Sequence, residues 1–262
     1  PPREGFKMIQ NDPKFLISFA GAKIEKSNKA DSNYKTGITY MTPSRPTCQD
    51  RSPGCWDGCL NSAGRGRFDN VKRARAQRLE LFLKHPEIFA ARERKELNLF
   101  IRRCDKAGQV GAYRPGGLDD TGRGEKLAAE FPELHLYDYT KNINRFMRIM
   151  GGPTAGVNPP RLSVECKYHL TFSRSETNWR DCLSALSVGN VAVVFRDSIP
   201  TRYKGFKVEN GELSDLRFLD SGPGRIIGLT AKGKAKADQS GFVVDVYRPL
   251  GKGSDSDFYP KK

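Results

Sequence analysis

The sequence predicts an α/β fold in which a largely parallel sheet forms a full or partial (β/α) barrel. Residues 109–141 follow the order strand, helix, strand, which is the pattern of a parallel βαβ unit. Residues 168–196 repeat that order, and their last strand, 190–196, is apolar throughout, as expected of a strand buried on both faces. Polar side chains follow several of these strands, and in parallel barrels the chemistry gathers at the carboxyl ends of strands.

Two strand-like segments come first. Residues 15–26 begin as an apolar run, and residues 35–48 contain a second run. Pro43 and Pro46 end this second strand, because proline favours extended or turn backbone. A cysteine-rich loop, 47–67, therefore follows a strand directly.

The longest helical stretch follows that loop. Pro86 interrupts it, which predicts two helices, 69–84 and 87–106. Asp69 or Asn70 is expected to cap the first of them.

Shorter elements complete the predicted sheet. Strands are expected at 109–115, 133–141, 168–176, 190–196, 225–236 and 241–247, with helices at 125–131, 142–152 and 178–189. The Asn210-Gly211 pair predicts a hairpin insert within residues 205–218.

The chain is long enough for one domain with a sizeable core, which we expect at residues 15–248. An N-terminal extension at 1–14 and a flexible polar tail at 249–262 would flank it. No apolar run approaches the roughly 18 residues that a membrane span requires, and the N-terminus lacks the apolar core of a secretory signal. We therefore expect a cytoplasmic protein without a membrane partner. Nothing in the sequence specifies an oligomeric state.

Three cysteines, Cys48, Cys55 and Cys59, lie at C-x6-C-x3-C spacing within the loop. Clustered thiols in an intracellular chain are more often metal ligands than disulfides, and soft thiolates suit iron–sulfur clusters or zinc. The loop is therefore a candidate metal site. The other cysteines stand in apolar contexts and are expected to be buried: Cys104, Cys166 and Cys182.

Basic residues crowd the end of this loop and the helix after it. The net charge of the chain is +15, which favours a polyanionic partner, most commonly nucleic acid. The alternative is an ordinary solvated helix face. The candidate nucleic-acid contacts are Arg65, Arg67, Lys72, Arg73, Arg75 and Arg78.

Polar residues at the predicted strand ends are candidates for the rest of the site. Asp119 and Asp120 follow the strand at 109–115, and Tyr139 and Lys141 end the strand at 133–141. Because carboxyl ends of parallel strands share one edge, these side chains should ring one mouth together with the cysteine loop.

Several segments resemble a known family, the uncharacterised phage and plasmid proteins of the gene-product-eighty-eight type, which are similar to radical-SAM barrels. The resemblance covers about residues 16–245. The segments that carry it are FAGAK, TCQDRSPGCWDGCLNSAGRG, GGLDD, FPELHLYDYTK, YHLTFSRSE, NVAVVFR, DLRFLD and IIGLTAKGKAK. A phage protein would act in the cytoplasm of its bacterial host.

This resemblance implies a radical-SAM type of barrel and the cofactors that go with it. Cys48, Cys55 and Cys59 would bind three irons of a [4Fe–4S] cluster and leave the fourth iron open for S-adenosylmethionine. Asp119 would contact the ribose or the methionine amine of that cofactor, with Tyr139 and Lys141 beside it. Radical-SAM enzymes usually have C-x3-C-x2-C spacing. The different spacing here weakens the case for radical chemistry more than the case for a bound cluster.

Two functions remain open on the sequence. The first is a radical-SAM-like iron–sulfur enzyme that acts on nucleic acid or nucleotides. The second is a basic nucleic-acid-binding protein with a structural metal, zinc or iron–sulfur, and no turnover. Structural zinc normally has four protein ligands, and only three clustered thiols are present, with every histidine distant in sequence. The open fourth position favours the enzyme, although the cysteines could also be reduced and free of metal.

Overall fold

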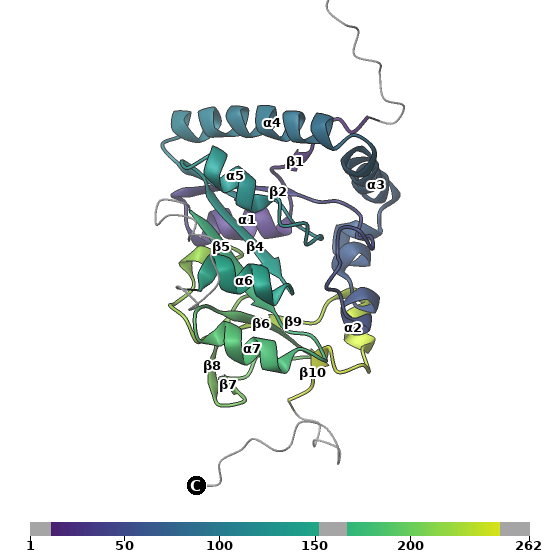
Figure 1. Cartoon of the computed structure of the whole chain (residues 1–262), viewed down its shortest axis with the longest axis vertical. Helices are drawn as coiled ribbons and strands as arrows, with labels where there is room; N and C mark the ends of the chain where they lie inside the picture. The colour runs from purple at the N-terminus through teal and green to yellow at the C-terminus, as the bar shows by residue number, and fades with distance from the viewer. Residues whose placement is uncertain (1–11, 152–166, 247–262) are drawn as a thin grey trace, which may run out of the picture.

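The computed structural model describes residues 12–151 and 167–246. These residues form a mixed α/β fold around a largely parallel sheet of ten strands, as the sequence predicts. The sheet is open, so the expectation of a barrel is corrected to a curved sheet with two free edges (Figure 1).

The strands run in the order β1-β2-β3-β4-β5-β6-β9-β8-β7, and β10 pairs with the second half of β6. Their bounds are β1 (Ile17–Ser18), β2 (Tyr34–Thr39), β3 (Val110–Arg114), β4 (His135–Thr140), β5 (Tyr168–Ser173), β6 (Val191–Phe195), β7 (Arg202–Tyr203), β8 (Phe206–Asn210), β9 (Ile226–Thr230) and β10 (Val243–Val244). Neighbours from β2 to β8 pair in parallel, whereas β1 and β7 are antiparallel to theirs. Each edge of the sheet thus ends in a two-residue antiparallel strand, and β2 and β8 do not meet.

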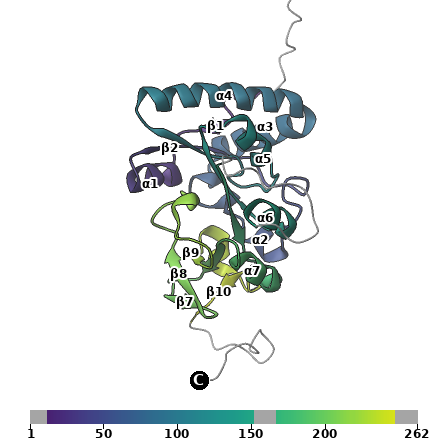
Figure 2. The same cartoon turned by 60° about the vertical axis from the view of Figure 1, so that its left-hand side comes forward.

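The helices follow the strands in the expected alternation. They are α1 (Ala22–Ala30), α2 (Pro53–Asp57), α3 (Asp69–Lys84), α4 (Pro86–Lys106), α5 (Gly124–Glu130), α6 (Ile143–Met150) and α7 (Trp179–Leu186), with short 3-10 turns η1 (Leu60–Ser62), η2 (Gly64–Arg67), η3 (Arg217–Leu219) and η4 (Gly233–Ala237). Helices α5, α6 and α7 lie side by side across one face of the sheet, and α4 crosses above them (Figures 1 and 2).

The helix-covered face holds the main core. Alternate residues of the strands point into it, including Tyr113, Leu136, Leu170 and Val193, all of which are fully buried. This alternation follows from the two-residue period of a strand.

The opposite, inner face is filled by the segment around η3. Leu216 packs there against Ala112 and Tyr137. The same segment contacts α1 from the other edge of the sheet, because Lys23 pairs with Asp215 at 3.5 Å. The chain therefore covers its inner face with a loop and a helix instead of closing the sheet.

Three local predictions are corrected. The hairpin turn is at Lys204-Gly205, where both residues have the positive φ that a type I′ turn requires, and not at Asn210-Gly211. Within the segment 15–26, only Ile17–Ser18 form a strand, and residues 22–26 begin helix α1.

The start of α3 differs from expectation as well. Phe68 occupies the N-cap position without a side-chain hydrogen bond, and Asp69 lies in the first turn. The predicted bounds of α3 and α4 are otherwise met to within one residue, because Pro86 is the first residue of α4.

Some predictions fall outside the described residues. They concern most of the N-terminal extension at 1–14, the tail at 249–262 and Cys166. Cys104 and Cys182 are buried, as expected.

Candidate functional site

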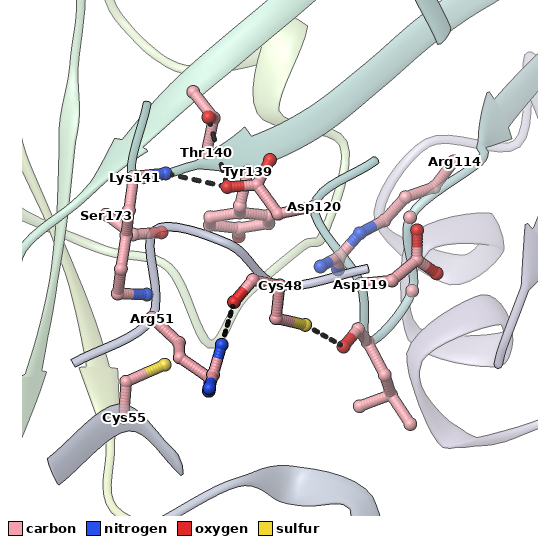
Figure 3. A pocket seen from close by; sticks show the side chains of 13 residues that line it. Cys48, Arg51, Cys55, Arg114, Asp119, Asp120, Tyr139, Thr140, Lys141 and Ser173 are labelled. Atoms are coloured by element: carbon pink, nitrogen blue, oxygen red, sulfur yellow. Dashed lines mark hydrogen bonds between the residues drawn. The ribbon is translucent and has the colours of Figure 1, made fainter. Parts of the chain in front are cut away.

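A pocket lies at the carboxyl ends of β3, β4 and β5 (Figure 3). Its volume is about 510 Å³, which includes its open mouth. The lining residues are Cys48, Arg51, Cys55, Arg114, Gly116, Gly117, Leu118, Asp119, Asp120, Tyr139, Thr140, Lys141 and Ser173.

The pocket joins the cysteine loop to the strand ends. The loop begins after β2, and parallel pairing of β2, β3, β4 and β5 places all four carboxyl ends at one edge of the sheet. Five predicted site residues therefore line one space: Cys48, Cys55, Asp119, Tyr139 and Lys141. Their roles as ligands stay predictions.

Cys48 is held by the loop that follows β3. Its Sγ atom lies 3.7 Å from the carbonyl oxygen of Leu118, and the neighbouring carbonyl of Thr47 accepts a hydrogen bond of 2.7 Å from the Asp120 amide. Burial raises the pKa of the Cys48 thiol to about 11, and the negative charge of Asp119 adds to the effect. Without a metal, this thiol is protonated at neutral pH.

Cys55 lies on α2, which a residue from the loop after β5 holds in place. The Ser52 hydroxyl caps α2 by accepting a hydrogen bond of 3.2 Å from the Cys55 amide. That hydroxyl donates to the Glu176 carboxylate at 2.6 Å, and the Gly54 amide donates to the same carboxylate at 2.8 Å.

Cys59 does not line the pocket but lies close to the other two thiols. Burial raises the pKa of its thiol, and an ionised Cys55 would raise that pKa further. An ionised Cys59 would in turn raise the pKa of Cys48. Arg75 of α3 holds this part of the loop by donating to the carbonyl and side-chain oxygens of Asn61, at 3.0 and 3.1 Å. Each cysteine is thus fixed by a different element of the fold.

The three thiols gather without being in ligating positions. The described residues contain no group of three or more His, Cys, Asp or Glu side chains placed to hold a metal ion. Figure 3 shows the Arg51 side chain between the sulfur atoms of Cys48 and Cys55. Arg51 donates to the Cys48 carbonyl at 2.9 Å, and its guanidinium lies 4.9 Å from the Trp56 ring centroid. Metal binding would therefore require Arg51 and the thiols to shift.

Three cations, Arg51, Arg75 and Lys141, lie near the thiols. Arg51 and Lys141 line the pocket, and the charges of Arg75 and Lys141 both lower the pKa of Cys59 against the effect of burial. In the described part of the chain, none of the three cations forms an ion pair with a carboxylate within 4.0 Å. The chemistry of this donor set therefore fits a thiolate-bound metal, although its present geometry does not.

Asp119 presents an oxygen without a partner. Its Oδ1 atom accepts hydrogen bonds from Arg123 at 2.8 Å and Thr121 at 3.1 Å. Its Oδ2 atom is buried and has no hydrogen-bond partner within the described residues. Arg123 is itself held by Glu93 at 3.1 Å, so the carboxyl group is rigidly placed. A ligand hydroxyl or amine could satisfy the remaining oxygen.

Asp120 and Lys141 form the opposite side of the pocket. Asp120 accepts hydrogen bonds from the Lys141 amide at 3.0 Å and from Thr140 at 3.2 Å, and it pairs with Arg145 of α6. Asp120 is therefore engaged by the fold, whereas the side chain of Lys141 extends into the pocket (Figure 3).

Buried Arg114 and half-buried Tyr139 form the floor of the pocket. The Arg114 guanidinium lies 4.5 Å from the Tyr139 ring centroid, and it bonds Asp215 of the η3 segment at 3.0 Å. Burial raises the pKa of neighbouring Asp138 to about 8 against the opposing charge of Arg114, and both Asp138 oxygens accept from the Gly116 amide. These groups tie the pocket to the inner face of the sheet.

Two charged pocket residues, Arg51 and Arg114, were not among the predicted site residues. Arg114 is the last residue of β3, so the strand-end rule that selected Asp119 could also have found it. Arg51 lies inside the cysteine loop, and only the folded loop shows that its side chain reaches the thiols.

The basic residues near the loop divide into two sets. Arg65, Arg67, Lys72 and Arg73 are exposed. Arg75 and Arg78 instead make contacts within the fold: Arg75 with Asn61, and Arg78 with the carbonyl oxygens of Phe15 at 2.8 Å and Tyr40 at 3.4 Å. Four of the six predicted contacts are therefore exposed, whereas the side chains of Arg75 and Arg78 bond to other segments. Contact of these residues with nucleic acid stays a prediction.

Comparison with known proteins gives one match. A family model described as gene product 88 matches residues 16–246. No curated protein and no solved structure matches the chain. Among the helices that the structure describes, none is both long and apolar enough to cross a membrane. The chain belongs to the gene product 88 family.

Proposed function

We propose that this member of the gene product 88 family holds an iron–sulfur cluster through Cys48, Cys55 and Cys59 and acts as a radical-SAM-like enzyme on nucleic acid or nucleotides. The observation that carries the proposal is the pocket at the carboxyl edge of the sheet. It brings two of the three cysteines together with Asp119 and Lys141.

The ligand set supports an iron–sulfur cluster more than structural zinc. Zinc in structural sites normally takes four protein ligands. Among the described residues, no histidine and no cysteine other than Cys48 and Cys55 lines this pocket. A metal centre held by three thiols keeps one position for a ligand that is not protein. Such a cluster, when bound, supplies the one-electron chemistry that radical-SAM enzymes use on S-adenosylmethionine.

The residues around the thiols have separate tasks in this proposal. The free Oδ2 atom of Asp119 would accept a hydrogen bond from a hydroxyl or amino group of S-adenosylmethionine. Lys141 would neutralise an anionic group, since in the described residues no carboxylate pairs with it. The half-buried Tyr139 ring would form the apolar floor under a bound ligand.

The four exposed cations support nucleic acid as the substrate class. Arg65 and Arg67 lie on η2, at the end of the cysteine loop, and Lys72 and Arg73 lie on the first turns of α3. Lysine and arginine side chains in such a position neutralise phosphates and would hold a strand next to the pocket.

A binding protein with a structural metal is the second candidate, and the same exposed cations favour it. Turnover of S-adenosylmethionine separates the two functions. After anaerobic reconstitution with iron and sulfide and addition of a strong reductant, we expect the enzyme to cleave S-adenosylmethionine. Asp119→Asn should weaken S-adenosylmethionine binding by about tenfold, because an amide replaces the accepting carboxylate.

Glu133→Gln, a change of the same kind on an exposed residue just before β4, is the matched control and should leave binding unaltered. A reconstituted protein that holds iron but neither binds nor cleaves S-adenosylmethionine would contradict the enzyme and leave the metal-bearing binder.

A further inference from the structure

Glu176 makes two hydrogen bonds to the cysteine loop across a long distance in sequence. Its Oε2 atom accepts from the Ser52 hydroxyl at 2.6 Å, and its Oε1 atom accepts from the Gly54 amide at 2.8 Å. These partners precede Glu176 by more than 120 residues. One carboxylate therefore joins the loop after β5 to the first turn of α2.

The contact continues from Ser52 to a candidate metal ligand. The Ser52 hydroxyl donates its hydrogen to Glu176 and accepts a hydrogen bond of 3.2 Å from the Cys55 amide. Donating to Glu176 fixes the rotation of the hydroxyl, so that its lone pair faces Cys55. The position of Cys55 thus depends on Glu176 through one intervening side chain.

Helix α2 also packs closely against the segment that contains Ser240 and Phe242. A Cβ atom on Gly54 would lie 2.1 Å from the Ser240 hydroxyl and 2.6 Å from the Phe242 Cβ, so only glycine fits. Arg174, two residues before Glu176, holds that neighbouring segment by donating to the Gly241 and Phe242 carbonyls at 2.6 and 2.9 Å.

The other two cysteines have their own supports. Cys48 contacts Leu118 in the loop after β3, and the turn after Cys59 is held by Arg75 of α3. Neither support includes Glu176. Loss of Glu176 should therefore affect one cysteine of the three.

We infer that Glu176 is a positioning residue that sets the place of Cys55 relative to the other two thiols. Its value to a metal site rests on the function proposed above, but the positioning itself does not require a metal. A carboxylate is needed because it accepts two hydrogen bonds at once, one on each oxygen.

Thiol alkylation of the metal-free protein tests the inference. Native protein is treated with iodoacetamide, and the modification rate of each cysteine is read by peptide mass spectrometry. In Glu176→Ala, the alkylation rate of Cys55 should rise about tenfold relative to that of Cys48 in the same sample. The variant loses the two charge-assisted hydrogen bonds that hold the first turn of α2, so α2 should open more often and expose Cys55 to the reagent. Ser52→Ala should give the same selective rise, and the double variant should add little to either single change.

Glu176→Gln serves as the conservative variant, since its amide oxygen can accept only one of the two donors in the present arrangement. It should give a rise between those of wild type and Glu176→Ala. Glu133→Gln controls for a general loss of negative charge and should leave all rates unaltered.

Equal rises for Cys48 and Cys55 would overturn the inference, because they would indicate general loosening. Unaltered Cys55 reactivity in Glu176→Ala would overturn it as well. Iron uptake is scored separately: if the wild type takes up no iron, the proposed function fails, while the alkylation result still decides the role of Glu176.

Discussion

His169 lies within β5 with its Nε2 atom unpartnered among the described residues. Burial, with a smaller effect of the positive charge of Arg217, lowers its pKa to about 4 from the usual 6.5. The folded chain thus keeps this imidazole neutral at a pH where the unfolded chain protonates it. Stability should therefore fall as pH decreases from about 6.5 towards 4.

His169→Gln should remove this dependence, because glutamine does not titrate. The free energy of unfolding of the wild type should drop by up to about 3 kcal/mol more than that of the variant between pH 7 and pH 4. Urea unfolding at several pH values measures the difference. Parallel curves for the two proteins would show that His169 is not held neutral.

The sequence did not predict which of the clustered basic side chains bond within the fold. Arg73 and Arg75 belong to one charge run, yet Arg73 is exposed while Arg75 bonds Asn61 and lies over the Tyr40 ring. A charge run shows how many cations are present, but not which of them the fold uses. For the three cysteines the sequence was informative. They stand close together in one loop, and the folded loop keeps their thiols near one another.

At the scale of elements, the basic segment formed by η2 and the start of α3 is the surface expected to contact nucleic acid. Replacing Arg67 and Arg73 by Gln should weaken binding of a labelled oligonucleotide in fluorescence anisotropy. The slope of log affinity against log salt should become shallower by about 2, since roughly one counterion is released per phosphate contact.

Arg102 and Arg103, exposed at the end of α4, provide the matched control because their replacement removes the same charge. This second pair should leave both the affinity and the salt slope nearly unaltered. If the two pairs have equal effects, binding depends on overall charge and not on this surface.

The η3 segment gives an element-scale test of the fold. Leu216 is fully buried against the inner face of the sheet, whereas Leu213, in the same segment, is 70% exposed. Leu216→Ala should lower the free energy of unfolding by about 2–5 kcal/mol, and Leu213→Ala by less than about 0.5 kcal/mol, measured by urea denaturation. Equal small effects would mean that the segment does not belong to the core.

Elements with strong local signals were the ones that the sequence could predict. Pro86 divides α3 from α4, and the apolar run of β6 is buried on both faces. Helix α1 was missed because it follows β1 after only three residues and its few apolar positions do not mark a periodic face. The sequence predicts a hairpin insert that includes the η3 segment, and only the folded sheet shows that Leu216 of this segment covers the inner face.

At the scale of the whole molecule, the largely parallel sheet of the predicted barrel is present, but the sheet is not closed. Parallel pairing of successive strands follows from the βαβ rhythm, and it alone gathers the strand ends at one edge. Closure depends instead on what covers the inner face and on how the edge strands end. Those contacts join α1 to the η3 segment across the sheet, and such long-range pairs leave no local pattern in the sequence.

The central claim is that the cysteine loop binds a metal cluster at this edge of the sheet. The loop lies there against the carboxyl ends of β3, β4 and β5. If the loop is a metal site, anaerobic reconstitution should load about four irons and four sulfides per chain, as a [4Fe–4S] cluster requires.

The iron and sulfide content of wild type, Cys55→Ala and Cys104→Ala, with the absorption spectrum of each, is the most direct measurement. We expect the wild type and Cys104→Ala to hold the cluster and Cys55→Ala to lose most of it, since Cys104 is buried away from the pocket. Stoichiometric zinc without iron in the wild type, or an unaltered cluster in Cys55→Ala, would contradict the account.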